Sequence, residues 1–154
     1  MSKFAENTSV SSEASRGEIE RTLRRYGADQ FAYMTGSTQA RIGFVAQNRQ
    51  VLFVIDMPDP RDREFTHTPA KGIVRSAAQA DAAYEQAVRQ RWRALNLVIK
   101  AKLEAVEAGI TEFEDEFLAH IVLPGGTTVG QAIREQLDDV YAGGGMLSLM
   151  PGGH

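Results

Sequence analysis

Apolar residues near the start of the chain recur with helical spacing. The positions are Ile19, Leu23 and Tyr26. Their i, i+4, i+7 pattern predicts an N-terminal helix with one apolar face. Ser15 and Glu18 have capping-box spacing, which predicts that the helix begins at Ser15, and Gly27 stands where a helix would end. Residues 1–14 are small and polar, and we expect them to be flexible.

Three runs rich in Phe, Val, Ile and Tyr follow this helix. They are Phe31–Thr35, Arg41–Gln47 and Val51–Asp56. Such residues favour a half-buried pleated surface, and the gap around Asn48-Arg49 is short enough for a hairpin. The pattern predicts a three-stranded antiparallel β-meander, one face of which needs a helix to cover it.

The segment 57–75 interrupts this regularity. It contains Pro58, Pro60 and Pro69, which exclude a regular helix across the segment. A loop of this length in a compact domain is usually functional or disordered.

A long helix is predicted from Ala77 to Ala108, with Ser76 and Gln79 at capping-box spacing. Its apolar stripe consists of Tyr84, Val88, Trp92, Leu95, Ile99, Leu103 and Val106. At 1.5 Å per residue this helix would span about 48 Å, whereas a compact domain of this size is roughly 40 Å across. The helix must therefore bend, break or protrude. If it protrudes, the stripe needs a partner, which predicts a homo-oligomer.

Two shorter helices are predicted in the C-terminal third. Thr111 with Glu114 and Thr128 with Gln131 are their capping boxes. The first helix carries Phe113, Phe117 and Leu118, and the second carries Val129, Ile133, Leu137 and Val140 on one face. The fold class is therefore α+β, with a single domain over residues 15–142. The Gly-rich apolar tail, 143–154, is expected to pack back on the body, with docking on a neighbouring molecule as the alternative.

The composition excludes several classes of protein. The chain contains no cysteine, which excludes disulfides, thiolate metal sites and cysteine nucleophiles. No apolar run reaches the roughly 18 residues of a membrane span, and the N-terminus has no apolar signal core. We therefore expect an intracellular protein without membrane contact.

The net charge of −3 is unevenly distributed. Residues 61–102 hold nine Lys and Arg against four Asp and Glu, which leaves +5. Residues 103–154 hold one against nine, which leaves −8. The basic and acidic zones either face each other, within one chain or between copies, or the basic zone binds an anion.

The basic zone includes the stretch Glu85–Leu103. Its cations are Arg89, Arg91, Arg93, Lys100 and Lys102. On a helical wheel Arg89, Arg93, Asn96 and Lys100 cluster away from the apolar stripe, whereas Trp92 lies on the apolar side and is expected in the core. Three interpretations remain open for the basic cluster: a solvent-facing helix back with ion pairs, a phosphate-binding face, or a contact for an acidic partner.

The preceding loop adds cations next to the start of this helix. Together they give the candidate phosphate contacts Arg61, Arg63, Lys71, Arg75, Arg89, Arg93 and Lys100. A loop of arginines beside a basic helix could follow a nucleic-acid backbone, either DNA or RNA. Phe65 is the only aromatic residue within this loop, which is few for a groove specific to single strands.

Evidence for catalysis is weak. Glu112, Glu116 and His120 have helical spacing that could bind a divalent ion, but carboxylates on a short helix are usually a solvated face. The chain lacks GxSxG, and PGGTTVGQ lacks the GK[ST] of a phosphate loop. We predict no catalytic residue, no metal and no cofactor. A protein that is not an enzyme is favoured, and a metal-dependent enzyme that uses Glu112, Glu116 and His120 stays as a third hypothesis.

Several stretches resemble a group of small proteins of unassigned function that bacteriophages and prophages encode. They are IERTLRRYGADQF (19–31), REFTHTP (63–69), YEQAVRQRWRALNLVIKAKLEAVEAGI (84–110), FEDEFLAHIVLPGGTTVG (113–130) and the closing MLSLMPG. The resemblance implies a phage or prophage origin, a location in the host-cell cytoplasm, and a small accessory protein without enzymatic activity.

Two functional hypotheses follow. The first is a phage accessory protein that binds nucleic acid during replication or recombination through the basic loop and helix. The alternative is a protein-interaction module, such as an inhibitor of a host factor or defence system, that acts through the acidic C-terminal third and the apolar tail.

Overall fold

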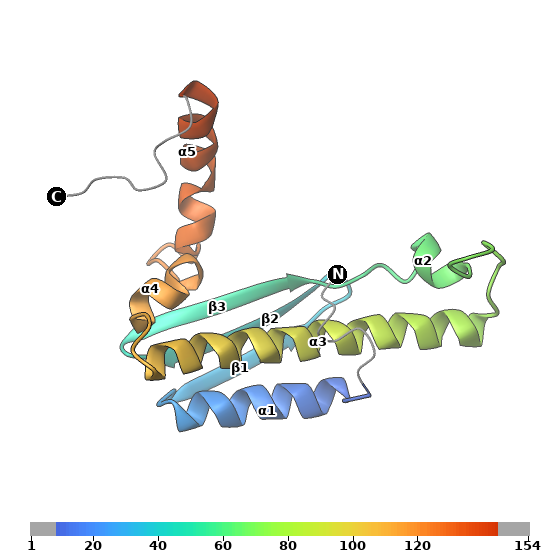
Figure 1. Ribbon diagram of the computed structural model, residues 1–154, viewed down its shortest axis with the longest axis horizontal. Coiled ribbons are helices and arrows are strands. Elements are labelled where there is room, and N and C mark those ends of the chain that lie inside the picture. The colour runs from blue at the N-terminus through green and yellow to red at the C-terminus, as the bar shows by residue number, and fades with distance from the viewer. Residues whose placement is uncertain (1–8, 145–154) are drawn as a thin grey trace.

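The structure, a computed structural model, describes residues 9–144. Its elements are α1 (Ser12–Arg25), β1 (Gln30–Thr35), β2 (Gln39–Ala46), β3 (Arg49–Asp56), α2 (Arg63–Thr66), α3 (Ala77–Glu107), α4 (Phe113–Phe117), the 3₁₀ turn η2 (Leu118–His120) and α5 (Val129–Gly143). Figure 1 shows α1 and the long α3 lying side by side next to the sheet. The predicted α+β class and element order are confirmed. The expectations for residues 1–8 and 145–154 lie outside the described residues.

The three strands form the predicted antiparallel meander in the order β1-β2-β3. Neighbouring strands pair residue for residue over their whole length. The connection between β2 and β3 lies one residue earlier than predicted, at Gln47 and Asn48 rather than around Asn48-Arg49. Both turn residues are left-handed, with φ of 52° and 58°. A two-residue turn of this kind matches the right-handed twist of the strands.

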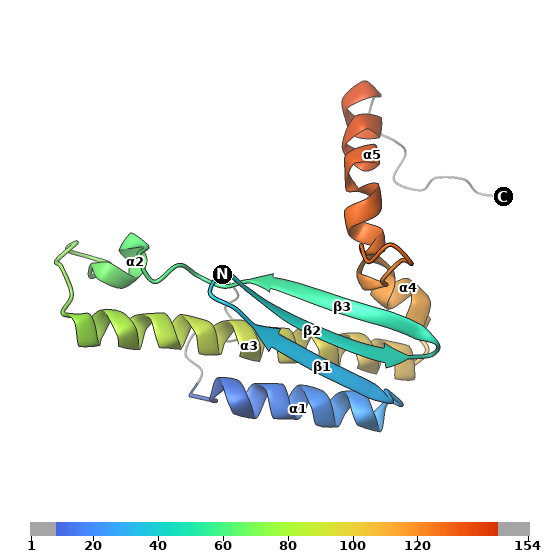
Figure 2. The same ribbon diagram turned by 180° about the vertical axis from the view of Figure 1, so that it is seen from behind.

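Helices cover one face of this sheet. The buried residues that form the layer between sheet and helices include Ile19, Leu23, Ala40, Ile42, Phe44, Ala46, Val51, Phe53, Trp92, Leu95, Ile99 and Leu103. They alternate along β2 and recur at helical spacing on α1 and α3, as a two-layer core requires. Figure 2 shows the opposite face of the sheet with no helix lying over it.

The long helix α3 protrudes, one of the three outcomes that its length predicts. It runs for 31 residues without interruption, about 46 Å, and its first half extends beyond the sheet. There the apolar stripe is covered from within the chain, because Phe65 of α2 packs edge-on against Tyr84 with ring centroids 5.6 Å apart. The segment 57–75 is thus not wholly irregular: it contains one helical turn, and His67 pairs with Val74 in a short β-bridge.

The start of α1 differs from the prediction. The helix begins at Ser12, and the Ser11 side chain accepts a hydrogen bond from the N–H of Ala14 at 3.1 Å. The predicted cap, Ser15, lies inside the helix and is fully buried. Capping-box spacing favoured Ser15 because Glu18 follows it by three residues. In the structure the Glu18 carboxylate makes an ion pair with Arg93 and does not cap the helix.

Two of the remaining capping boxes are confirmed. Ser76 with Gln79 opens α3, and Thr128 with Gln131 opens α5, each with both reciprocal hydrogen bonds. The box predicted at Thr111 is wrong. The N-cap of α4 is Glu112, whose side chain makes no capping hydrogen bond. The hydroxyl of Thr111, the predicted cap, donates to the carbonyl of Glu112.

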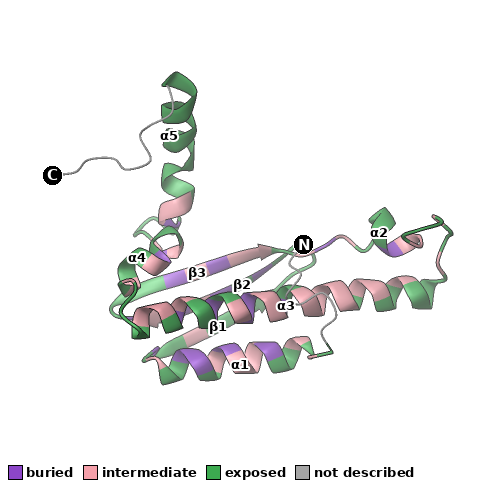
Figure 3. Ribbon diagram, viewed as in Figure 1, coloured by how far each residue is buried: buried purple, intermediate pink, exposed green. Residues whose placement is uncertain are grey.

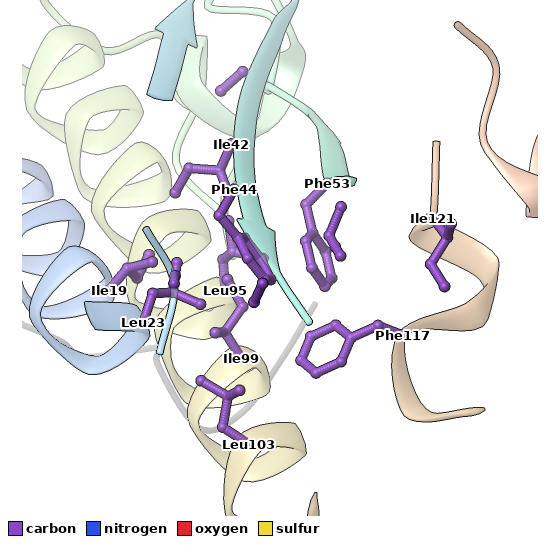
Figure 4. Packing of buried hydrophobic residues seen from close by; sticks show 14 of the residues in the cluster. Ile19, Leu23, Ile42, Phe44, Phe53, Leu95, Ile99, Leu103, Phe117 and Ile121 are labelled. Carbon is purple, nitrogen blue, oxygen red and sulfur yellow. The ribbon is translucent and has the colours of Figure 1, made fainter. Parts of the chain in front are cut away.

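The short helix α4 closes the end of the core. Phe117 is fully buried and packs edge-on against Phe44 and Phe53, with ring centroids 5.8 and 6.2 Å away. Phe113 packs on the same ring at 4.8 Å. Figure 4 shows Phe117 and Ile121 reaching toward the strand residues from the C-terminal segment. This cluster anchors the C-terminal third to the sheet.

Candidate interaction surfaces

One member of the basic cluster on α3, Arg93, contacts α1. Asn96, which at 100° per residue lies at the edge of the cluster nearest the apolar stripe, is 1% exposed. Next to it, the Arg93 guanidinium donates to Oε2 of Glu18 at 2.9 Å, with both side chains about one-third exposed. This ion pair is compatible with the interpretation of a helix back with ion pairs, although the pair links α3 to α1, whereas Lys100 is exposed. The ion pair of Arg93 with Glu18 links α3 to α1.

Three further candidates also have partners within the chain. Arg61 makes three hydrogen bonds to the Asp59 carboxylate, and these bonds hold the pKa of Asp59 below its usual value. Arg75 donates at 3.2 Å to two main-chain carbonyls of α2, at Glu64 and Phe65, which ties α2 to the start of α3. Arg89 donates from Nε to Oε1 of Gln86 at 3.0 Å. The Arg61 side chain nevertheless remains 88% exposed.

The last three candidates, Arg63, Lys71 and Lys100, are exposed. None of them has a side-chain hydrogen bond or ion pair to another residue between 9 and 144. They do not form one patch, because Lys100 lies about 35 Å along α3 from the loop. The seven candidates therefore divide into a loop cluster around Arg61, Arg63 and Lys71 and isolated positions along the helix.

Acidic residues balance the charge around the loop cluster. From residue 57 to residue 89 the chain carries five basic and five acidic side chains. The acidic ones are Asp59, Asp62, Glu64, Asp81 and Glu85. Within residues 61–102, residues 61–88 hold four basic and four acidic side chains, so the excess of +5 comes from the five cations at 89–102, of which Arg93 is paired with α1 and Lys102 with α4.

A cavity of about 520 Å³ lies where α1, the β1–β2 turn and α3 meet. Its lining includes Arg16, whose guanidinium lies over the rings of Tyr33 and Trp92 at 4.8 and 4.9 Å from their centres. Arg16 also pairs with Glu13 at 3.6 Å. Trp92 is 1% exposed, as expected for a core residue, so it offers no ring face to a ligand. Sequence reasoning missed Arg16, because its neighbours come from β1 and α3 and no spacing reveals them.

The residues of the hypothetical metal site do not converge. Glu116 pairs with Lys102 of α3, Nζ to Oε1, at 3.2 Å. The His120 ring stacks on Phe53 with centroids 4.0 Å apart. Between residues 9 and 144 no group of three carboxylates and histidines is placed to hold a metal ion. The ion pair and the ring stack give these residues structural roles.

The surroundings of His120 shift its titration. Burial lowers the pKa of His120, the nearby Lys102 charge lowers it further, and a backbone hydrogen bond at Leu52 opposes the shift. The ring lies in a cavity of about 320 Å³ between β3 and the base of α5, whose lining also includes Asp56 and Arg134. The surroundings of His120 therefore disfavour its protonated form at the junction between α5 and the body.

The helix α5 projects from the body and is exposed over most of its length. Its base is held by bonds to the segment after η2, including the N–H of Val129 to the carbonyl of Ile121 at 2.9 Å. Every residue from 131 to 144 is exposed, as Figure 3 shows by its colour along the helix. The predicted apolar face is real but uncovered: Ile133, Leu137, Val140 and Tyr141 are 41%, 49%, 59% and 58% exposed.

The polar side of α5 is acidic. Its charged residues are Arg134, Glu135, Asp138 and Asp139, which give a net charge of −2. Together with its capping box, this makes α5 a helix with one apolar stripe and one acidic side. Helices of this kind pack their stripe on another surface.

Comparison with known proteins identifies no relative. No protein-family model matches the chain. No curated protein and no solved structure matches it either. Within residues 9–144, no helix combines the length and apolar character needed to cross a bilayer.

Proposed function

We propose that this protein is a non-enzymatic interaction module that presents α5 to a partner protein. This is the alternative hypothesis from the sequence, and α5 is the part of the acidic C-terminal third that supports it best.

The observation that carries the proposal is the uncovered stripe of α5. Ile133, Leu137 and Val140 lie about one turn apart and are each 41–59% exposed. An isolated helix of 15 residues is marginal in water, and most helical stability in proteins comes from packing an apolar face. The apolar stripe and the capping box together therefore favour a helix that packs its stripe on a partner molecule.

The spacing of the stripe indicates the mode of binding. Anchors at i, i+4 and i+7 are typical of an amphipathic helix that lies in an apolar groove of its partner. The acidic residues beside the stripe favour a groove with a basic rim, because complementary charge speeds association and excludes wrong partners. Such a role suits the phage or prophage accessory protein that the sequence resemblance implies.

Site-specific photo-crosslinking in cells tests the proposal. A photoreactive residue replaces Leu137 in the full chain, and a matched control replaces Glu135, which is also exposed but lies about 160° round the helix. We expect position 137 alone to yield a protein adduct, which mass spectrometry identifies. The purified partner should then bind Leu137→Glu at least about tenfold more weakly than wild type or Glu135→Gln. Equal adducts from both positions, or none, would contradict the proposal.

Nucleic-acid binding is a second candidate, favoured by the loop cluster. Arg63 and Lys71 have no side-chain partner within residues 9–144, and Arg61 remains 88% exposed despite its bond to Asp59. Anisotropy titrations of labelled DNA and RNA should show affinity that falls as salt rises and that is lost when Arg61, Arg63 and Lys71 are changed to glutamine. Affinity that is absent or independent of salt would exclude this function.

A further inference from the structure

The strand β1 is an open edge of the sheet. The order β1-β2-β3 leaves one side of β1 without a partner strand among the described residues. β1 reads QFAYMT, with no charge, no proline and no bulge. Five of its six residues are exposed, including Tyr33 at 51% and Met34 at 59%. Natural proteins usually protect such edges with charges, prolines or bulges, because unpaired main-chain groups invite another strand.

The hydrogen-bond pattern identifies the groups on that edge. The N–H of Gly36 donates to the carbonyl of Gln39 at 2.8 Å, which makes these two residues a bonded pair. Bonded and non-bonded pairs alternate along an antiparallel ladder. Ala32 and Met34 therefore direct their main-chain groups to β2, and Phe31, Tyr33 and Thr35 direct theirs to the open edge.

A groove in the helix layer lies beside the same edge. It has a volume of about 210 Å³ and lies between α1 and β1. Its lining residues are Glu13, Arg16, Gly17, Glu20, Phe31 and Tyr33. Gly17 is therefore at the level of Phe31 and Tyr33, the residues on either side of Ala32. The unpaired edge of β1 and the groove beside α1 therefore lie at the same level of the structure.

The exposed side of α1 is self-complementary in charge about Gly17. Glu13 precedes Gly17 by four residues and Arg21 follows it by four, so all three lie on one helix face. Arg21 is exposed and has no ion pair to another residue within the described range 9–144. When two copies of α1 lie antiparallel and cross at Gly17, Glu13 of each lies opposite Arg21 of the other. Gly17 itself has no side chain, and the Arg21 guanidinium that lies over it, 3.3 Å from where a Cβ would be, has to turn toward Glu13 of the other copy for the helices to approach closely.

We infer that the occupant of this edge is β1 of a second copy, related by a two-fold axis that passes Ala32 and Gly17. The two β1 strands pair antiparallel, with Phe31 of one copy opposite Tyr33 of the other, and the two sheets become one of six strands. The two α1 helices pack across the same axis and fill the groove. This surface is separate from the stripe of α5, so the dimer leaves α5 available to its partner.

Symmetry and size favour a second copy over another protein. A two-fold contact requires a patch that complements itself, and both an antiparallel strand pair and the Glu13–Arg21 pairs satisfy that requirement. A stable interface takes roughly 20–30 residues from each side. β1 offers six residues and α1 offers ten outside its buried Ser15, Ile19, Thr22 and Leu23, which approaches this number, whereas the stripe of α5 offers four large apolar side chains.

Cysteine crosslinking tests the arrangement directly, because the chain has no native cysteine. Ala32 would face its own copy across a non-bonded pair, where Cα atoms lie about 4.5 Å apart, within the range that a disulfide spans. We expect mild oxidation of Ala32→Cys to give a covalent dimer. Ala101→Cys, equally exposed on α3, is the control and should give several-fold less. Equal crosslinking of the two variants would overturn the inference.

Sedimentation analysis of the full chain gives the second readout. Wild type should sediment at twice the chain mass of 16.9 kDa. Ala32→Lys, which places two like charges at the axis, should raise the dissociation constant at least about tenfold. Arg21→Glu should weaken the dimer, and Arg21→Glu combined with Glu13→Arg should restore it. A monomeric wild type, or a dimer indifferent to all of these changes, would overturn the inference whatever the outcome for α5.

Discussion

The guanidinium of Arg93 donates a hydrogen bond to Oε2 of Glu18 at 2.9 Å and so joins α3 to α1. These residues are 75 positions apart in the chain. The bond shows that Arg93, within the basic stretch of α3, is paired inside the chain, whereas Arg91 and Lys100 of the same stretch are exposed. It also gives Arg93, one of the seven candidate phosphate contacts, a structural role.

Changing Arg93 to glutamine should therefore reduce stability rather than ligand affinity. The pair is about one-third exposed, and we expect a loss of about 1 kcal/mol in the free energy of unfolding. Chemical denaturation of wild type and variant measures this loss. Arg91→Gln is the matched control, because Arg91 is exposed on the same helix and should change stability little. An equal loss in both variants would contradict the structural role of the pair.

The buried amide of Asn96 leads to the opposite expectation. Neither its Nδ2 nor its Oδ1 has a hydrogen-bond partner within residues 9–144, although the side chain is 1% exposed. Replacing an unpaired buried polar group with an apolar one of similar size removes a desolvation cost. Asn96→Leu should raise the free energy of unfolding by about 1 kcal/mol. Asn96→Asp, which buries a charge, should lower it. A clear loss of stability in Asn96→Leu would show that the amide is satisfied in solution.

The fold was largely predictable from the sequence because its signals are local. The spacing of Ile19 and Leu23, the alternation in β2, and the capping box at Ser76 each lie within a short window. Each agrees with the element that forms there. The box predicted at Ser15 failed because three serines lie within five positions, at 11, 12 and 15, and the structure uses Ser11.

The candidate sites were less predictable because their chemistry depends on contacts between distant segments. A helical wheel placed Asn96 among the cations, but it could not show that α1 covers that side of α3. The partner of Arg93 comes from α1, and the rings beneath Arg16 come from β1 and α3. The exposure of the α5 stripe could not be predicted from the sequence either, because a helix packed on its own core has the same pattern of apolar residues.

The pH dependence of stability should include a contribution from His120. Burial and Lys102 lower its pKa from the ordinary value of 6.5. Below about pH 6.5 the unfolded chain binds a proton that the folded chain resists, so the free energy of unfolding should fall as the pH falls through this window. The contribution should disappear in His120→Phe, which retains a ring to stack on Phe53. Denaturation of both proteins between about pH 7.5 and 5.5 measures the difference, and parallel curves would contradict the assigned shift.

The stripe of α5 should contribute almost nothing to the stability of the free protein. Leu137 is 49% exposed, so Leu137→Glu should change the free energy of unfolding by less than about 0.5 kcal/mol. Ile99 is fully buried, and Ile99→Ala should cost about 3 kcal/mol. Hydrogen exchange on wild type should agree, with amides beyond residue 131 exchanging well before those of α3 around Ile99. A large loss in Leu137→Glu would mean that α5 packs against the chain itself. A negligible loss would leave binding to a partner as the reason for an apolar residue at this position.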